Sequence, residues 1–274
     1  MTRKTVIFIV EGNTDKTALE NIFRKIYKNK NINVEVTQGD ITSDAAIKDE
    51  DLENVIFSLV KNYMDDKKLR KSDIWQIVQV FDTDGTYVPE TAIVQGDTKE
   101  FYYTESTISC KNRQKIIDRN EMKSRRMEYL LQLDCIKDIP YKCYFMSSNL
   151  DHALYDEQNL SDEEKKERAD EFAGLFLNKP EVFIDYLNQY VVNGVPSSYP
   201  SSWRYIKNGL NSLNRHTKQY LTNIYNNTPS YDGAMRKLQI SFKSFFGSDD
   251  FTRIFVTELN QVMTEMVNKA FIII

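Results

Sequence analysis

Three acidic residues directly follow two apolar runs of the chain. Glu11 comes after Val6–Val10, and Asp82 and Asp84 come after Ile74–Phe81. Two carboxylates one residue apart can approach one hard cation from a turn. Magnesium, or Mn²⁺ in its place, prefers oxygen ligands and keeps several waters, so two or three carboxylates suffice. The spacing predicts a catalytic metal site built from Glu11, Asp82 and Asp84, in which Glu11 can also take a proton from an attacking water.

Further residues near these acids are secondary candidates for the site. Gly85 allows a sharp backbone turn after the acidic pair. A helix starting near Asp15 would point its amides toward the same place, which suits a phosphate. Asp15 either joins the site or is simply an acid in the first turn of that helix. For His152 the alternative is a structural or surface role. The secondary candidates are Gly12, Asp15, Gly85, Asn149, Asp151 and His152.

A basic segment of the chain is a candidate nucleic-acid-binding strip. On a helix, residues three or four apart share one face, and four basic residues have that spacing. Such a face can hold a phosphate backbone beside a metal site. The alternative is a solvated helix face, since acidic residues lie nearby in the sequence. The four residues are Lys115, Arg119, Lys123 and Arg126.

The elements that must position these residues alternate between strand and helix. Val6–Val10 is a continuous apolar run, typical of a strand buried on both faces. Apolar stripes predict helices over Asp15–Tyr27 and Leu52–Tyr63, with strands at Ile32–Val36 and Ile74–Phe81. This order is typical of an α/β fold with a parallel sheet flanked by helices. Ligands usually bind at the carboxyl edge of such a sheet, where Glu11 and the Asp pair are expected.

The segment from residue 86 to 158 is expected to complete this α/β part. Residues 86–110 form a long excursion, either a loop or a hairpin, and Lys111–Leu133 form a basic helix. Tyr141–Met146 is a further strand, and Ser147–Asn149 open a helix containing Asp151, His152 and Asp156.

From about Ser161 the pattern becomes helical. Ser161 and Glu164 have the spacing of a capping box, and Pro196–Ser202 is rich in Pro and Ser, which indicates a loop or linker. The sequence thus predicts an α/β domain over residues 1–158 and a helical C-terminal region over 159–274. That region can recognise substrate, dimerise or dock a partner. Its further helices are expected near 180–192, 203–226, 233–246 and 249–269.

Composition indicates a folded protein without a membrane anchor. The chain has 274 residues, of which 41% are hydrophobic, and its net charge is −4. An acidic protein lacks a global basic field for nucleic acid, although a local strip can still bind phosphates. No apolar stretch reaches the length of a membrane span. The three cysteines include no C-x-x-C pair and are expected to be reduced, in a cytoplasmic protein.

Two segments together resemble the signature motifs of the Toprim domain. They are VIFIVEGNTDKTAL, residues 6–19, and VQVFDTDG, residues 78–85. A third segment, Tyr144–Asn149 with Asp151 and His152 after it, is similar to a strand and acidic helix of RloB-like proteins, although the usual proline and aromatic residues of that motif are absent. The resemblance covers roughly residues 4 to 155. It implies that Glu11 acts as general acid or base and that Asp82 and Asp84 hold magnesium.

The resemblance also implies a function. Stand-alone Toprim proteins of this size are similar to abortive-infection effectors of phage defence, which often work beside a separate ATPase. We therefore expect a magnesium-dependent endonuclease that hydrolyses DNA or RNA, including transfer RNA. The resemblance does not decide between a monomer and a homodimer. Two alternatives remain: a catalytically inactive Toprim-fold binding or regulatory subunit, and an enzyme that transfers phosphate on a nucleotide.

Overall fold

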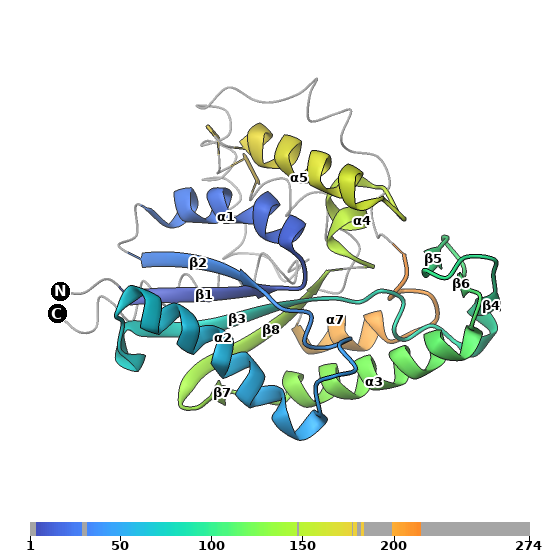
Figure 1. Cartoon of the computed structure of the whole chain (residues 1–274), viewed down its shortest axis with the longest axis horizontal. Helices are drawn as coiled ribbons and strands as arrows, with labels where there is room; N and C mark the ends of the chain where they lie inside the picture. The colour runs from blue at the N-terminus through green and yellow to red at the C-terminus, as the bar shows by residue number, and fades with distance from the viewer. Residues whose placement is uncertain are drawn as a thin grey trace.

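The computed structural model describes residues 4–28, 32–146, 148–176, 178–179, 182–183 and 199–214. Its centre is a five-stranded sheet in the order β2-β1-β3-β8-β7 (Figure 1). The first four strands in that order run parallel, and β7 pairs antiparallel with β8 at one edge. The strands are β1 (Lys4–Val10), β2 (Ile32–Gln38), β3 (Ile74–Asp82), β7 (Cys135–Ile136) and β8 (Ile139–Met146).

Helices cover both faces of this sheet (Figure 1). One face carries α1 (Asn13–Lys28), α4 (Leu150–Tyr155) and α5 (Asp162–Phe176). The other carries α2 (Leu52–Lys67), α3 (Arg113–Leu131) and α7 (Tyr199–Ile206). Short 3₁₀ turns lie at Asp49–Asp51, Lys71–Asp73 and Glu90–Ala92.

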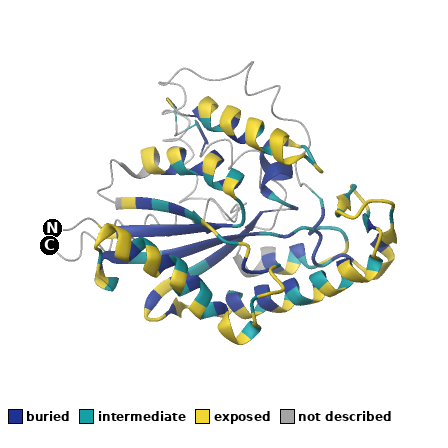
Figure 2. Cartoon of the chain, in the orientation of Figure 1, coloured by how far each residue is buried: buried dark blue, intermediate teal, exposed yellow. Residues whose placement is uncertain are grey.

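The alternation of side chains along β1 explains the two hydrophobic cores. Val6, Phe8 and Val10 face α1, while Ile7 and Ile9 face the opposite layer, and all five are buried. Successive residues of a strand point to opposite faces, so a wholly apolar strand must be covered on both sides. Figure 2 shows the central strands buried and the outer surfaces of the helices exposed.

Residues beyond 158 contribute to both of these cores. Phe172 and Phe176 of α5 pack in the core beside α1. Trp203 of α7 packs edge-on against Phe81 and Phe145 on the other face of the sheet. These burials complete the two outer layers. None of the described helices has both the length and the apolarity needed to cross a membrane.

A small second sheet adjoins the amino-terminal end of α3. It has the order β4-β6-β5, in which β5 and β6 form an antiparallel hairpin. Val88, Ile108, Ile116 and Leu213 lie in a separate apolar cluster beneath it. The hairpin alternative for residues 86–110 is thus confirmed. The strands are β4 (Ile93–Gln95), β5 (Tyr102–Tyr103) and β6 (Ile108–Cys110).

The predicted α/β architecture with a mostly parallel sheet is confirmed, and three local predictions are wrong. Tyr199–Ser202 belong to helix α7 rather than to a loop, because proline is well tolerated in the first turn of a helix. Asp156 lies just beyond α4, as a left-handed residue that ends the helix. The capping box is confirmed, since Ser161 Oγ accepts from the Glu164 amide and Glu164 accepts from the Ser161 amide. The helix predicted at 203–226 is wrong beyond Ile206, where α7 ends and turns follow to residue 214. Its second half, most of the helix predicted at 180–192, and the helices predicted at 233–246 and 249–269 lie outside the described residues.

Candidate functional site: a carboxylate cluster at the sheet edge

Glu11 and the Asp82/Asp84 pair follow adjacent strands of the sheet. Strands β1 and β3 are hydrogen-bonded neighbours. From β1 the chain goes to β2 on one side, and from β2 it crosses back to β3 on the other side of β1. This reversal makes the edge between β1 and β3 a topological switch point, the usual ligand site of open parallel sheets. The placement of the acids expected from the sequence is thus reproduced.

The turn after β3 has an unusual backbone. Asp84 and Gly85 have positive φ values of 44° and 66°. A Cβ atom on Gly85 would lie 2.5 Å from Cδ1 of Ile108, so the turn passes against β6 at a distance that only glycine allows. The role predicted for Gly85 is supported by both observations.

Segments far apart in sequence hold this turn. The amide of Asp84 donates to the carbonyl of Ser148 at 2.6 Å, beyond the end of β8. The Thr83 hydroxyl and the Gly85 amide both donate to the carbonyl of Ser212, at 2.6 and 2.8 Å. Because Thr83 is fully buried, these bonds satisfy its polar groups and fix the turn between Asp82 and Asp84.

One lysine links the two acidic motifs. Nζ of Lys123, on α3, donates to Oδ2 of Asp84 at 2.6 Å and to Oε2 of Glu11 at 3.1 Å. The Lys123 side chain has no solvent exposure. Burial disfavours the ammonium, but Asp84 and Glu11 outweigh that cost and hold the pKa of Lys123 above its usual range. The lysine is therefore a built-in counter-ion of the cluster.

Arg119 and Asn120 extend the contact of α3 with the turn. Nη2 of Arg119 donates a hydrogen bond to the carbonyl of Asp84 at 3.0 Å, and Nη1 lies 3.6 Å from the Asp84 carboxylate. Asn120 donates to the carbonyl of Gly85 at 3.2 Å. Three residues of one helix face thus bind the turn through both its backbone and its carboxylate.

The second oxygen of Glu11 is held from the loop after β2. Thr42 donates its hydroxyl proton to Oε1 of Glu11 at 2.9 Å. Arg126 of α3 fixes this loop, because its buried guanidinium donates to several loop carbonyls and to Asp49. The carbonyl acceptors are those of Ile41, Thr42, Asp44 and Ile47.

The carboxylates of the cluster do not share one protonation behaviour. Burial raises the pKa of Glu11 to about 7; Lys123 opposes the rise, and Asp84 and Asp40 add to it. Burial also disfavours ionised Asp84, but the charges of Lys123 and Arg119 outweigh it and lower the pKa of Asp84. The cluster thus contains one carboxylate that stays ionised and one that titrates near neutral pH, an arrangement typical of acid–base sites.

Asp82 is the least compensated carboxylate of the cluster, because the charge of Lys123 offsets only part of its burial. It has no hydrogen-bond or ion-pair partner among the described residues. Burial, followed by the negative charges of Asp15 and Glu11, raises the pKa of Asp82 well above its ordinary value. Asp82 is therefore the group of the cluster that would gain most from a bound cation.

Asp15 and Asp151 belong to the same electrostatic group. Asp15 accepts from the Gly12 amide at 2.8 Å, and burial raises the pKa of Asp15 to about 6, with Asp151 adding to the rise. Asp151 lies 3.6 Å from the ammonium of Lys165 on α5, and burial raises the pKa of Asp151. Asp15 thus lies in the first turn of α1, and its charge also acts on Asp82 of the cluster.

The other secondary candidates have structural contacts. Asn149 caps α4, since its side-chain oxygen accepts from the His152 amide at 2.8 Å. Nδ1 of His152 lies 3.2 Å from Gln158, and Nε2 lies 3.7 Å from Asp156. These contacts favour the structural alternative for His152.

The four basic residues of α3 were predicted to form one exposed strip, and two of them are buried. Lys115, Arg119, Lys123 and Arg126 do share one side of α3, but Lys123 and Arg126 are buried against the site and the loop after β2. The prediction that these two residues bind phosphates at the surface is therefore wrong, because both make their hydrogen bonds inside the protein. Lys115 is exposed and Arg119 retains 10% exposure of its side chain, so these two remain candidates.

The donor atoms of the cluster decide whether it suits a metal ion. In the described part of the chain, no three His, Cys, Asp or Glu side chains are grouped as metal ligands, and Lys123 lies between Glu11 and Asp84. The donor chemistry nevertheless fits a hard cation, because Asp82 and its neighbours carry oxygen ligands and excess negative charge. Asp82, with Asp84 and Glu11, would hold such an ion.

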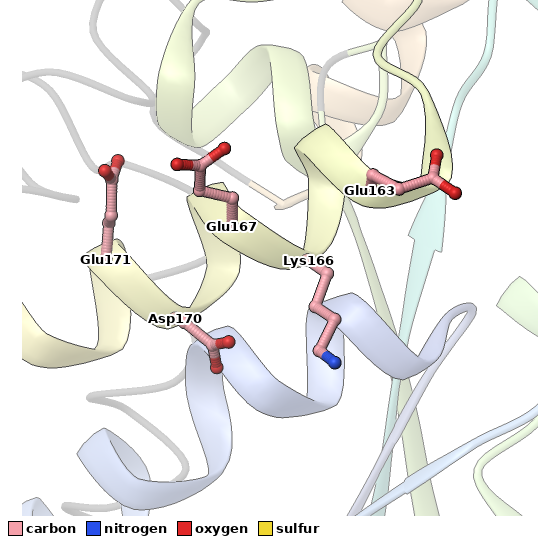
Figure 3. Close-up of a pocket in the computed structure, with 5 residues that line it drawn as sticks. All are labelled: Glu163, Lys166, Glu167, Asp170 and Glu171. Carbon is pink, nitrogen blue, oxygen red and sulfur yellow. The ribbon is translucent and has the colours of Figure 1, made fainter.

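A surface concavity on α5 is separate from this cluster. Figure 3 shows it lined by exposed side chains of that helix, namely Glu163, Lys166, Glu167, Asp170 and Glu171. None of these residues contacts Glu11, Asp82 or Asp84 through a bond that the structure shows. We assign this acidic surface no role in the site.

Sequence reasoning missed the partners that complete the site. Thr42, Lys165 and Ser212 carry no motif and come from three separate segments. Lys123 did carry a signal, because it lies within a stripe of otherwise uncharged residues of α3 at spacings of three and four. The stripe is Ile116, Asn120, Lys123, Met127 and Leu130, all of them buried.

Comparison of the chain with protein-family models, with curated proteins and with solved structures found no match.

Proposed function

We propose that the chain is a Toprim-like, magnesium-dependent nuclease that hydrolyses phosphodiester bonds of DNA or RNA. The observation that carries the proposal is that the three carboxylates of the cluster differ in their partners and in their pKa values. Asp84 is paired with Lys123 at 2.6 Å, Glu11 has a pKa of about 7, and Asp82 has no partner among the described residues. Hydrolysis by such a cluster needs an ionised ligand, a group that exchanges a proton near neutral pH and a place for a cation.

Each side chain has a defined task in this proposal. Magnesium, held by Asp82 and Asp84 with Glu11, would polarise the phosphate and offset its developing charge. Glu11 accepts the proton of the attacking water, which its raised pKa allows at neutral pH. Thr42 fixes the orientation of Glu11 through its 2.9 Å hydrogen bond. Arg119 adds positive charge at the rim, where the substrate phosphate would lie.

The biological setting proposed here rests on the motif resemblance. Toprim-like proteins of this size are similar to toxic effectors of anti-phage defence, which are held or released by a separate ATPase. We propose the same role for this chain, as a cytoplasmic effector with an ATPase partner.

Cleavage by the purified chain tests the proposal. Plasmid, single-stranded DNA and total RNA would be incubated with Mg²⁺ or Mn²⁺ and with wild type, Glu11→Ala or Asp82→Ala. The exposed Asp97→Ala serves as the matched control, because it removes a carboxylate outside the cluster. We expect cleavage by wild type and the control alone. Wild-type rates in Glu11→Ala would contradict the proposed mechanism.

One observation favours a second candidate, a catalytically inactive binding or regulatory subunit. Lys123 already neutralises two of the three predicted ligands, so the cluster is charge-compensated in part without a metal. The discriminating measurement is metal binding by calorimetry, since an inactive cluster should bind neither Mg²⁺ nor Mn²⁺. Cleavage only after co-expression with an ATPase partner would instead identify a regulated effector.

A further inference from the structure

An aromatic and basic strip adjoins the carboxylate cluster. It consists of Phe101, which directly precedes β5, Tyr103 of β5, and Lys115 and Arg119 of α3. The guanidinium of Arg119 lies 4.9 Å from the ring centroid of Phe101, and the ammonium of Lys115 lies 5.2 Å from it. Arg119 Nη2 also lies 3.5 Å from the Tyr103 hydroxyl and donates to the carbonyl of Asp84. The strip is therefore in direct contact with the turn that carries Asp84.

Strand β5, which carries Tyr103 and directly follows Phe101, is fixed on both edges. One edge of β5 pairs with β6. On the other edge, Tyr103 donates its amide proton to Oδ1 of Asn159 at 2.7 Å and accepts from Nδ2 of Asn159 at 2.8 Å. Figure 1 shows β5 on the side of the small sheet that faces α4 and α5. A binding surface held in this way loses little conformational entropy when a ligand binds.

Part of the binding capacity of the strip is unused within the described residues. The rings of Phe101 and Tyr103 are half-buried, because they pack on the small apolar cluster with one side. The exposed ammonium of Lys115 has no carboxylate partner in the same part of the chain. These groups offer ring surface and positive charge beside a cluster that is otherwise acidic.

Aromatic rings interleaved with cations are the surface that binds single-stranded nucleic acid. Bases stack on the rings, and the phosphates are attracted by Lys and Arg. In a duplex the bases stack on each other, so their faces are not available to such a surface. We propose that Phe101, Tyr103, Lys115 and Arg119 bind an unpaired segment of nucleic acid next to the carboxylate cluster. This inference rests on the proposed nuclease function and names its substrate class as single-stranded.

The neighbouring residue Tyr102 provides a matched control. It is more exposed than either Phe101 or Tyr103, at 49%. In the β5–β6 pairing Tyr102 lies opposite Ser109, whereas Tyr103 lies opposite the buried Ile108. Because successive side chains of a strand face opposite ways, Tyr102 points away from the strip. If exposed tyrosines bound nucleic acid non-specifically, affinity would depend on Tyr102, whereas binding by the proposed strip would not.

Binding would be measured by fluorescence anisotropy with the full chain in Ca²⁺, so that hydrolysis by the magnesium form does not interfere. The probes are a short labelled DNA strand, its RNA counterpart and the corresponding duplexes. The test variant is Phe101→Leu/Tyr103→Leu, which retains apolar packing and removes the ring faces, and the control is Tyr102→Leu. Lys115→Ala, an exposed site, tests the cationic part, and thermal melts verify folding of every variant.

We expect a single strand to bind at least about tenfold more tightly than the duplex, and the double variant to lose about tenfold in affinity for it. Tyr102→Leu should stay within about twofold of wild type, and Lys115→Ala should reduce the salt dependence of binding. Equal affinity for strand and duplex, an equal loss in Tyr102→Leu, or no binding of either probe would overturn the inference.

The two proposals can fail separately. Strand binding that is lost in the double variant, without cleavage in Mg²⁺, would support the strip and contradict the nuclease. Cleavage at wild-type rates by a well-folded double variant would support the nuclease and contradict the strip.

Discussion

The ammonium of Lys123 donates to the carboxylate of Asp84 at 2.6 Å, inside a site where the lysine is inaccessible to solvent. The same ammonium reaches Glu11 at 3.1 Å. This sharing explains why two nearby acids behave differently: the pKa of Asp84 is lowered, while burial raises the pKa of Glu11 to about 7. Lys123 thus links the two acidic motifs, and together with Arg119 it keeps Asp84 ionised.

Replacing Lys123 by Met should destabilise the metal-free protein and make metal binding tighter. Removing one member of a buried ion pair leaves the remaining charges uncompensated, which costs on the order of 3 kcal/mol. The variant then depends on a divalent cation for the charge that the lysine supplied. We expect a lower melting temperature in chelator and a larger upward shift with Mn²⁺ than in wild type, measured by calorimetry.

The exposed Lys115→Met on the same helix is the matched control, and its melting temperature should change little. A Lys123→Met protein whose Mn²⁺-induced shift is no larger than that of wild type would show that lysine and metal do not compete for these carboxylates.

The free energy of unfolding of the metal-free protein should fall as the pH rises from about 4 to about 7. Glu11 and Asp15 have ordinary pKa values of 4.5 and 3.8, and folding raises them to about 7 and about 6. The folded state therefore binds more protons than the unfolded state in this window, and it loses that advantage as the pH passes the folded pKa. Urea titrations at several pH values in chelator would measure the slope.

Glu11→Gln should make this slope smaller, because the amide does not titrate. The exposed Glu100→Gln should leave it unchanged. A slope of the opposite sign in wild type would contradict the burial of uncompensated acids at this edge.

Asp82→Asn should stabilise the metal-free protein at mildly alkaline pH while it removes cleavage. The substitution eliminates a carboxylate that has no partner among the described residues and whose pKa is raised by burial and by Asp15. A gain of about 1 kcal/mol is typical when a functional but destabilising group is removed. Denaturation would measure the gain, and the Mg²⁺-induced rise in melting temperature should disappear. Asp97→Asn is the control, and a less stable Asp82→Asn protein would contradict this account.

Gly85→Ala should be more damaging than Gly209→Ala, although both glycines have positive φ, at 66° and 56°. Left-handed backbone alone costs about 1–2 kcal/mol for alanine. At Gly209 a Cβ atom meets no other group within 4 Å, whereas at Gly85 it lies 2.5 Å from Ile108. We expect about 3 kcal/mol or more for Gly85→Ala, together with loss of cleavage. Equal destabilisation in thermal melts would mean that the turn does not press against β6.

The sequence allowed the sheet and its acidic edge to be predicted because both depend on local pattern. Apolar runs that end in acids identified β1 and β3, and the strand–helix order predicted that they lie side by side. The orientation of α3 was not predictable in the same way. Spacing shows that Lys123 and Arg126 share a helix face, but the acids that attract Lys123 lie 39 and 112 residues away in sequence.

The partners from the loop after β2 and from residues 210–213 depend even more on tertiary packing. Thr42 and Ser212 are ordinary polar residues, and only the folded chain brings them to Glu11 and Thr83. The small second sheet was predicted no further than a possible hairpin, because its strands are two or three residues long and leave little periodicity.

The bond from Thr83 to Ser212 spans 129 residues of sequence, and this separation has a consequence for biosynthesis. A chain emerging from the ribosome presents β1 and β3 long before residue 212 is made. Until then the Gly85 amide lacks its native acceptor, and the Thr83 hydroxyl has only the carbonyl of Ser148, at 3.2 Å, so the acidic turn is not fully fixed. The contacts that hold the acidic turn are therefore completed only after residue 212 has been made.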